Sequence, residues 1–410
     1  MEHLTWHEQR RVYALLEDRD YQADVLSHLS SESSREVTRE LTEEIMVDIL
    51  DRMPPEDATD VVAILPLATQ NRILQELADD ESSEVVRGLL KWPADSAGGR
   101  MSPNAFLMPL TATCGQAIAA LQQNYAQFES VYYVYIVDPA RTVHGVCSLR
   151  MLLTHPPRTP LASIMARDVL TVLPTQDQEE VARYVARYDL LAIPVVDEAG
   201  AILGLVTVDD VVDVIQDEAA EDMMLMAGVS DGDSRSILRQ TWQRAGWLMA
   251  TIFGGIIAAE IIGLYETTLQ RVAVLAGFIP VIMGMGGNVG IQSATLAVRG
   301  LATGQVQLGG ATSFVFREAR VGLALGALFA TLMGVYGVLR YPDTPLIGTS
   351  VAASILLAIG SAAGIGAVIP LAFQRIGVDP AIATGPFVTT VVDLLGIVIY
   401  FNVARLMLGL

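Results

Sequence analysis

The sequence is poor in the residues that build disulfide frameworks and thiolate metal sites. It contains only two cysteines, Cys114 and Cys147, in 410 residues. Two cysteines argue against a disulfide framework and against a zinc site built on thiolates. The five histidines, at positions 3, 7, 28, 144 and 155, do not have zinc-like spacing either. We therefore expect any bound metal to be a hard cation held by oxygen atoms.

The C-terminal part also lacks lysine and carries little charge of either sign. From Thr241 onward there are eight arginines and six acids, a net charge of +2. Because the whole chain carries −20, the preceding 240 residues carry −22. Such an acidic excess argues against a nucleic-acid partner, which needs basic patches. It suits hydrated cations, and it suits plain solubility equally well.

Long apolar runs fill the same C-terminal part. Apolar residues make up 52% of the chain, and its mean hydropathy is +0.42. About 20 apolar residues cross a bilayer as a helix. Five such runs occur, near residues 246–265, 272–298, 321–339, 346–373 and 381–404. We expect five membrane spans after an acidic soluble part, and the polar N-terminus predicts no cleavable signal peptide.

The arginines around these runs predict the orientation. Cytoplasmic loops carry an excess of arginine and lysine. Placing the N-terminus in the cytoplasm gives the inside more arginines than the outside, which would hold Arg271, Arg340 and Arg405. We therefore expect a multi-pass protein with a cytoplasmic N-terminus.

The last apolar run contains a solitary acid. Asp393, which ends the stretch from Thr389, is the only charge between Asp379 and Arg405. A carboxylate inside a span costs roughly 2.5–3.5 kcal/mol on insertion scales and usually faces a polar pathway. We interpret Asp393 as facing a cation path. The alternative is a protonated side chain buried against another helix.

The second apolar run is rich in small and polar residues. It contains Pro280, Gly284, Gly286, Gly287, Asn288, Gly290, Gln292 and Ser293. Glycine and proline allow a helix to break, and freed carbonyls are tolerated there only where they are buried or line a polar cavity. The adjacent amides and hydroxyl favour a pore lining, and the alternative is close helix packing.

The soluble part divides into a helical segment and a repeat. Residues 1–98 show short amphipathic patterns that predict an all-α domain. In residues 99–216, the β-rich runs 131–138 and 190–197 end in Asp and recur at an offset of 59 residues. Each leads through a second strand into a helix, so the tandem resembles a pair of CBS modules in an α/β domain.

The CBS resemblance implies a nucleotide site in the second copy. In CBS pairs that bind adenosine nucleotides, a Gly-x-x-Thr-x-x-Asp motif holds phosphate and ribose, and Gly204, Thr207 and Asp210 match it. ATP is the candidate ligand. The first copy has Met151 where the acid is expected, so we expect weak binding, on the Thr207 and Asp210 face.

Residues 217–243 follow the repeat, and this segment begins with a cluster of charges. We expect it to form a connecting helix before a membrane domain at 244–410. The alternative is a solvated linker. Together these parts predict a multidomain membrane protein with an all-α N-terminal domain, a tandem CBS domain and a transmembrane domain of five helices.

The whole chain resembles the MgtE-type magnesium channels. The matching stretches include Asp95–Met101, Asp177–Glu180, Glu218–Asp222, Gly286–Thr295 and Asp379-Pro-Ala together with Asp393. The resemblance implies a homodimer in the bacterial cytoplasmic membrane that passes Mg²⁺ down its gradient. It also implies closure when cytosolic Mg²⁺ binds between the acidic soluble domains, with residues 217–243 as a plug helix.

The resemblance also implies a set of Mg²⁺ sites. Asp393 is then the principal pore ligand, Asn288, Thr389 and Thr390 hold the water shell of the ion, and Asp379 is a candidate second membrane-side site. The expected sensor ligands are the acids of the soluble half: Asp79, Asp80, Glu84, Asp177, Glu179, Asp210, Glu218, Glu221 and Asp222.

Two other classes compete with a channel. An ion-coupled secondary transporter would use a broken second span as a midplane site. A membrane-anchored nucleotide sensor would need one span and no intramembrane acid. No nucleophile–base constellation is present in the sequence, so we do not expect an enzyme.

Overall fold

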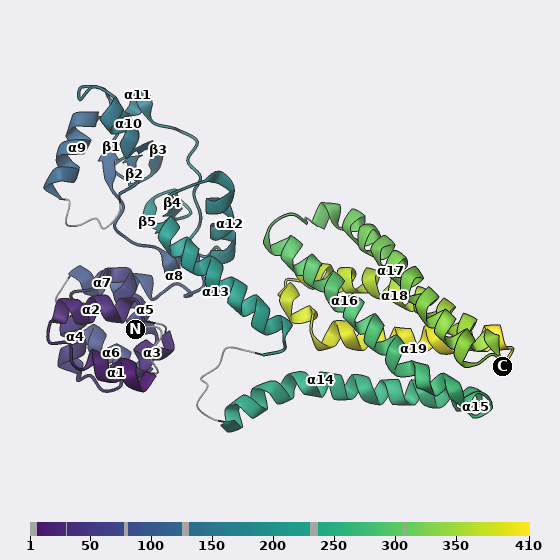
Figure 1. Cartoon of the computed structure of the whole chain (residues 1–410). Coiled ribbons are helices and arrows are strands. Elements are labelled where there is room, and N and C mark those ends of the chain that lie inside the picture. The colour runs from purple at the N-terminus through teal and green to yellow at the C-terminus, as the bar shows by residue number, and fades with distance from the viewer. Residues whose placement is uncertain (1–5, 30, 78–80, 125–130, 230–236, 307) are drawn as a thin grey trace. The chain divides into compact units, whose positions relative to one another are not determined.

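The computed structural model describes residues 6–29, 31–77, 81–124, 131–229, 237–306 and 308–410 (Figure 1). The chain divides into two units, Met1–Asp217 and Glu218–Leu410, and each is considered by itself.

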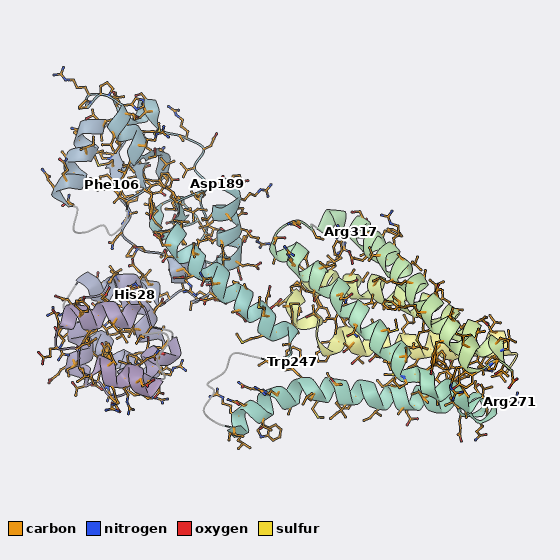
Figure 2. All side chains as sticks on the ribbon, in the orientation of Figure 1. His28, Phe106, Asp189, Trp247, Arg271 and Arg317 are labelled. Carbon is orange, nitrogen blue, oxygen red and sulfur yellow. The ribbon has the colours of Figure 1, made fainter. Side chains whose placement is uncertain are left out.

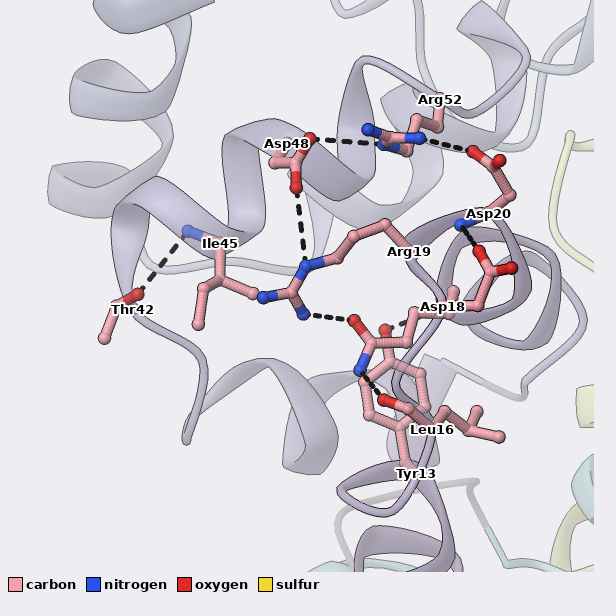
Figure 3. Close-up of polar contacts among 10 residues, drawn as sticks. Tyr13, Leu16, Asp18, Arg19, Asp20, Thr42, Ile45, Asp48 and Arg52 are labelled. Atoms are coloured by element: carbon pink, nitrogen blue, oxygen red, sulfur yellow. Dashed lines mark hydrogen bonds and ion pairs between the residues drawn. The ribbon is translucent and has the colours of Figure 1, made fainter.

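Short helices form the start of the first unit, as the sequence predicted. They are α1 (Trp6–Tyr13), α2 (Arg19–Ser27), α3 (Ser31–Thr38), α4 (Glu43–Leu50), α5 (Pro55–Ala63), α6 (Leu67–Glu76) and α7 (Glu81–Leu89). Ile49, Val62 and Ile73 are fully buried in their shared core. Arginine–aspartate pairs join α2 to α4, with Arg19 on Asp48 and Arg52 reaching Asp20 (Figure 3). These pairs are exposed, so the apolar core carries most of the stability.

The repeat follows in two α/β copies. The first contains β1 (Leu107–Pro109), α9 (Cys114–Gln123), β2 (Tyr133–Val137), β3 (Val143–Ser148), α10 (Leu149–Thr154) and α11 (Leu161–Ile164). The second contains α12 (Gln178–Tyr188), β4 (Ala192–Val196), β5 (Ile202–Thr207) and α13 (Val208–Met226), with α8 (Ala97–Arg100) ahead of both copies. β1 is parallel to β2, and β2–β3 and β4–β5 are antiparallel hairpins.

The register of the two hairpins repeats at the predicted offset. Val134 pairs with Cys147 in the first, and Ile193 pairs with Val206 in the second, each pair 59 residues apart from its counterpart. The aspartates that end the first strands close both turns. Asp138 accepts from the Thr142 amide at 2.9 Å, and Asp197 accepts from the Ala201 amide at 2.8 Å. The hydrogen bond from Thr142, with that from His144, lowers the pKa of Asp138.

Among its described residues, the second unit contains five helices long and apolar enough to cross a membrane, which confirms the predicted number of spans. They are α14 (Ile237–Leu264), α16 (Ile279–Ala302), α17 (Ala311–Arg340), α18 (Pro345–Arg375) and α19 (Pro386–Leu408). Between them lie α15 (Glu266–Arg271) and the short 3₁₀ turns η3 (Ala273–Phe278), η4 (Leu308–Gly310) and η5 (Pro380–Ala383).

The second span is continuous, which corrects the expectation of a broken helix. Pro280 lies in the first turn of α16, where a proline removes no helical hydrogen bond. The glycines serve close packing instead. A Cβ added at Gly366 of α18 would lie 2.2 Å from the carbonyl oxygen of Gly290, so the two backbones touch at this point.

The connecting segment continues the second CBS copy. Residues 217–226 belong to α13, which begins directly after β5, and residues from Ile237 onward belong to α14. Gly228 follows α13 with φ +68°, a left-handed conformation that glycine adopts at no steric cost. The described residues of 217–243 are therefore the end of α13 and the beginning of α14, and their role as a plug stays a prediction.

We predict that Gly366→Ala destabilises the membrane unit, because its methyl group would overlap the Gly290 carbonyl. Overpacking of this kind costs about 1–3 kcal/mol. The matched control is Gly364→Ala in the same helix, where the nearest atom to the new methyl group would be the Ala319 Cβ at 3.8 Å. Thermal unfolding of the purified chain in detergent measures both, and equal melting temperatures would contradict the packing argument.

Candidate functional site

Asp393 lies in the second turn of α19, which begins at Pro386. Its side chain is half-buried, and its Oδ1 is buried with no hydrogen-bond partner among the described residues. A Cβ added at Gly287 of α16 would lie 3.4 Å from this oxygen. The carboxylate therefore faces a glycine, and its buried oxygen lies against the bare backbone of α16 on that side.

An unpartnered carboxylate oxygen is costly in an apolar bundle, since burying a polar group without a hydrogen bond costs a few kcal/mol. The described residues offer this oxygen no hydrogen-bond donor. Its unused acceptor fits a cation or the water around one, and both the cation path and the alternative of a protonated side chain against another helix stay predictions.

The other predicted pore residues are placed differently. Thr389, one turn before Asp393, uses its hydroxyl to donate to the carbonyls of Gly385 and Pro386, at 3.3 and 3.1 Å. Its methyl group lies on the Gly287 side, near Asp393. Thr390 packs instead on Gly254 of α14, where an added Cβ would lie 2.3 Å from its Cγ2. Asn288 is exposed.

Asp379 has a local structural role. It is exposed and precedes η5, where its carboxylate accepts from the Ala381 amide at 2.8 Å. It therefore caps the turn that leads into α19, and it does not lie in a span.

A second acid in the bundle was missed by the sequence analysis. Glu318 of α17 is only 4% exposed. Ser293 of α16 donates to its Oε2 at 3.2 Å, and Arg317 donates to its Oε1 at 3.3 Å. Ser293 was predicted as a pore residue, but its hydrogen bond holds α16 to α17. Ser293 and Glu318 are 25 positions apart, so no local sequence pattern indicated that they pair.

The sensor candidates are dispersed. Asp79 and Asp80 lie outside the described residues, and Glu84 is exposed on α7. Asp177 caps α12 by accepting from the Glu179 amide at 2.8 Å. Glu218, Glu221 and Asp222 follow one another along α13, with Glu221 exposed. Among the described residues, no three His, Cys, Asp or Glu side chains are close enough to form a metal site.

Thr207 and Asp210 are bonded to each other at the start of α13. The Thr207 hydroxyl donates to Asp210 Oδ2 at 2.6 Å, and the Thr207 amide donates to the same oxygen at 3.1 Å. Burial raises the pKa of Asp210, and the two hydrogen bonds from Thr207 oppose that shift. Both predicted nucleotide ligands are thus oriented by a helix cap.

Asp60 of α5 joins this group and was not predicted. Asp60 as a whole residue is exposed, yet desolvation of its carboxyl group raises its pKa. The positive charge of Arg100 opposes this shift, and the negative charge of Asp210 adds to it. Arg100 in turn donates to Gln178 at 2.9 Å and lies 3.8 Å from Asp217. Arg100 therefore lies near Asp217, and its charge opposes the raised pKa of Asp60.

Comparison with known proteins identifies the family. Three family profiles match: "MgtE intracellular N domain" at residues 1–95, "CBS domain" at 161–217 and "Divalent cation transporter" (MgtE) at 279–403. A "Magnesium transporter MgtE" of Thermus thermophilus is 37% identical over 98% of this chain and 90% of its own length. The chain belongs to the MgtE family. The Bacillus subtilis MgtE is 34% identical over 85% of this chain and 78% of its own length.

Solved structures of MgtE soluble parts are also similar. The cytosolic domain of the Mg²⁺ channel MgtE in complex with ATP is 35% identical, with a TM-score of 0.48, over 52% of this chain and 86% of that chain. The family profiles and the relatives confirm the resemblance to the MgtE family, and with it the tandem of helical domain, CBS modules and membrane helices.

Proposed function

We propose that the chain is a channel for Mg²⁺, with Asp393 as the ligand in its pore. The observation that carries this proposal is the unpartnered Asp393 oxygen facing Gly287 between apolar helices. The Thermus, Bacillus and Enterococcus relatives, each named a magnesium transporter, supply the choice of ion.

The chemistry of Mg²⁺ suits a site with few protein ligands. Mg²⁺ loses its waters reluctantly, and its sites commonly use one or two carboxylates and keep several waters. In a two-fold homodimer with the pore on the axis, two copies of Asp393 would face one divalent ion. Without an ion their mutual repulsion would favour protonation of one of them. The oxygens of Thr389 and Asn288 would contact the water shell.

The continuous α16 bears on the alternative of an ion-coupled secondary transporter. That reading relied on a broken second span, and α16 runs unbroken from Ile279 to Ala302. A channel needs no such break. Flux that required a sodium or proton gradient would favour the transporter over the channel.

Asp393→Asn tests the pore ligand. The change keeps the size of the side chain and removes its charge, so Mg²⁺ flux into liposomes should fall at least tenfold, the equivalent of about 1.4 kcal/mol. Asp343→Asn, which removes one exposed acid between α17 and α18, is the matched control and should leave flux unchanged. Undiminished flux in Asp393→Asn, with the control behaving as expected, would refute the assignment.

We further propose that ATP, if supplied, binds at the second CBS copy through Thr207 and Asp210. The Thr207 hydroxyl is already committed to Asp210, so a ligand must compete with that bond. Binding should therefore be weak. Calorimetry of the full chain in detergent should show ATP binding that Asp210→Ala abolishes and that Asp213→Ala, on the exposed side of α13, retains. Binding that survives Asp210→Ala would place the nucleotide elsewhere.

The acidic soluble half is proposed to act as a Mg²⁺ sensor that closes the pore. A net charge of −22 repels itself, and self-repulsion opposes compaction. The pKa values of Asp60 and Asp210 are raised chiefly because burial disfavours the charged carboxylate, and a neighbouring negative charge adds to each shift. A divalent ion between such acids would relieve the repulsion. Because a ligand shifts an equilibrium only by its differential affinity, several weak sites would act together.

Neutralising Glu218, Glu221 and Asp222 together tests the sensor. Protease sensitivity of the full chain should fall as Mg²⁺ rises from 0 to about 20 mM, a range that brackets weak hard-cation sites. The triple variant should lose most of this protection. A control that neutralises three exposed acids of the helical segment, Glu17, Glu40 and Glu44, should retain it. Equal protection in both variants would mean that the acids of α13 do not sense Mg²⁺.

A further inference from the structure

A basic cavity lies where α16 turns into α17. It has a volume of about 440 Å³. Its lining combines two arginines and two smaller polar residues with apolar side chains and glycines: Leu296, Arg299, Gly300, Gln305, Val306, Gly310, Ser313, Phe314 and Arg317. None of these residues belongs to the proposed pore or sensor.

The turn between the helices builds one wall of the cavity. The Val306 amide donates to the Gly300 carbonyl at 2.8 Å, which folds the chain back over the end of α16. A Cβ at Gly300 would lie 2.5 Å from Val306 Cγ2, so only glycine permits this approach. Val306 also packs against Leu301 and Phe314. The cavity is therefore a consequence of local packing.

One of the two arginines of the cavity keeps an unbalanced positive charge. Arg317 is paired with Glu318 at 3.3 Å, and the buried Glu318 also accepts from Ser293. Arg317 also lies over the Phe314 ring, with its Cζ 4.9 Å from the ring centroid, which restrains the guanidinium. Within the described part of the chain, the Arg299 side chain is exposed and has no ion pair or hydrogen bond of its own.

The position along α17 places the cavity at the edge of the bilayer. Arg317 lies near the N-terminal end of α17 (Figure 2), and Arg340 ends the helix. The 23 residues between them correspond to about 35 Å at 1.5 Å per residue, slightly more than the roughly 30 Å of a hydrocarbon core. Arg317 is thus expected at the depth of lipid phosphates.

We propose that this cavity binds the phosphate of an anionic glycerophospholipid such as phosphatidylglycerol. Guanidinium groups bind phosphate by paired, charge-assisted hydrogen bonds, and basic pockets between membrane helices are suited to anionic head groups. The apolar wall favours a lipid over free phosphate. Leu296 is 46% exposed beside the arginines, and the neighbouring Phe316 is 70% exposed, so a glycerol and acyl chain would cover surface that phosphate leaves bare.

Lipid-dependent stabilisation of the full chain tests the proposal. In neutral detergent, phosphatidylglycerol should raise the melting temperature by several degrees, whereas phosphatidylcholine and inorganic phosphate at equal concentration should not. Arg299→Gln should remove at least half of the shift. Arg320→Gln is the matched control. It removes an exposed arginine near the start of α17 that does not line the cavity, so the variant should keep the full shift in melting temperature.

Three outcomes would overturn the proposal. An equal shift in Arg299→Gln and the unchanged chain would place the lipid elsewhere, and an equal shift with inorganic phosphate would make this a site for free anions. If Arg299→Gln lowered the melting temperature in lipid-free detergent by as much as the lipid raises it, an acid of the chain itself would occupy the cavity. Native mass spectrometry provides a second readout, in which Arg299→Lys should retain the bound lipid and Arg299→Gln should lose one molecule per chain.

Discussion

Close backbone packing around α16 determines how the membrane unit can hold a carboxylate. At Gly290 the backbone touches that of Gly366 in α18, and at Gly287 the missing side chain leaves space in front of Asp393 of α19. Gly287 and Gly290 lie about one turn apart, so the same face of α16 meets both α18 and α19. A larger residue at Gly287 would push α19 away from α16 or crowd the Asp393 oxygen. The small residues thus set both the packing and the polarity of this face.

Glu318 and Asp393, two of the acids in the membrane helices, show how environment separates the roles of carboxylates. Glu318 is buried but satisfied by Ser293 and Arg317, so its charge is balanced where it stands. Asp393 has a buried oxygen that no described residue satisfies. A satisfied buried charge fixes the arrangement of helices, whereas an unsatisfied one invites a ligand. For this reason we propose Asp393 as the ligand in the pore, whereas Glu318 positions α16 against α17.

The parts of the fold that follow from local patterns were predictable from the sequence. The strands of the repeat and the five apolar spans are local features, and the structure contains both. The glycines and proline of the second run allowed either a break or close packing, and α16 is continuous because Pro280 fits the first turn of a helix. Asp60 and Glu318 were not found from sequence. Glu318 accepts from Ser293 and the pKa of Asp60 responds to Asp210, and both neighbours lie far away in the chain, where a local pattern carries no record of them.

The contacts around α16 also bear on which part of the bundle can move. Touching backbones at Gly290 and Gly366 leave no side chain that could rotate to absorb a shift, so α16 and α18 are expected to move as one body. The contact with α19 is made by side chains instead, since a Cβ at Gly290 would lie 3.0 Å from Val392 Cγ2 and 3.2 Å from Val388 Cγ1. A change in access to Asp393 is therefore accommodated most easily by small displacements of α19 against the α16–α18 pair. Asp379 accepts a hydrogen bond from the Ala381 amide in η5, the turn that precedes α19, and this bond does not involve α19 itself. Side chains can rotate where touching backbones cannot, so small displacements of α19 would change the space beside Asp393 without breaking the close α16–α18 contact.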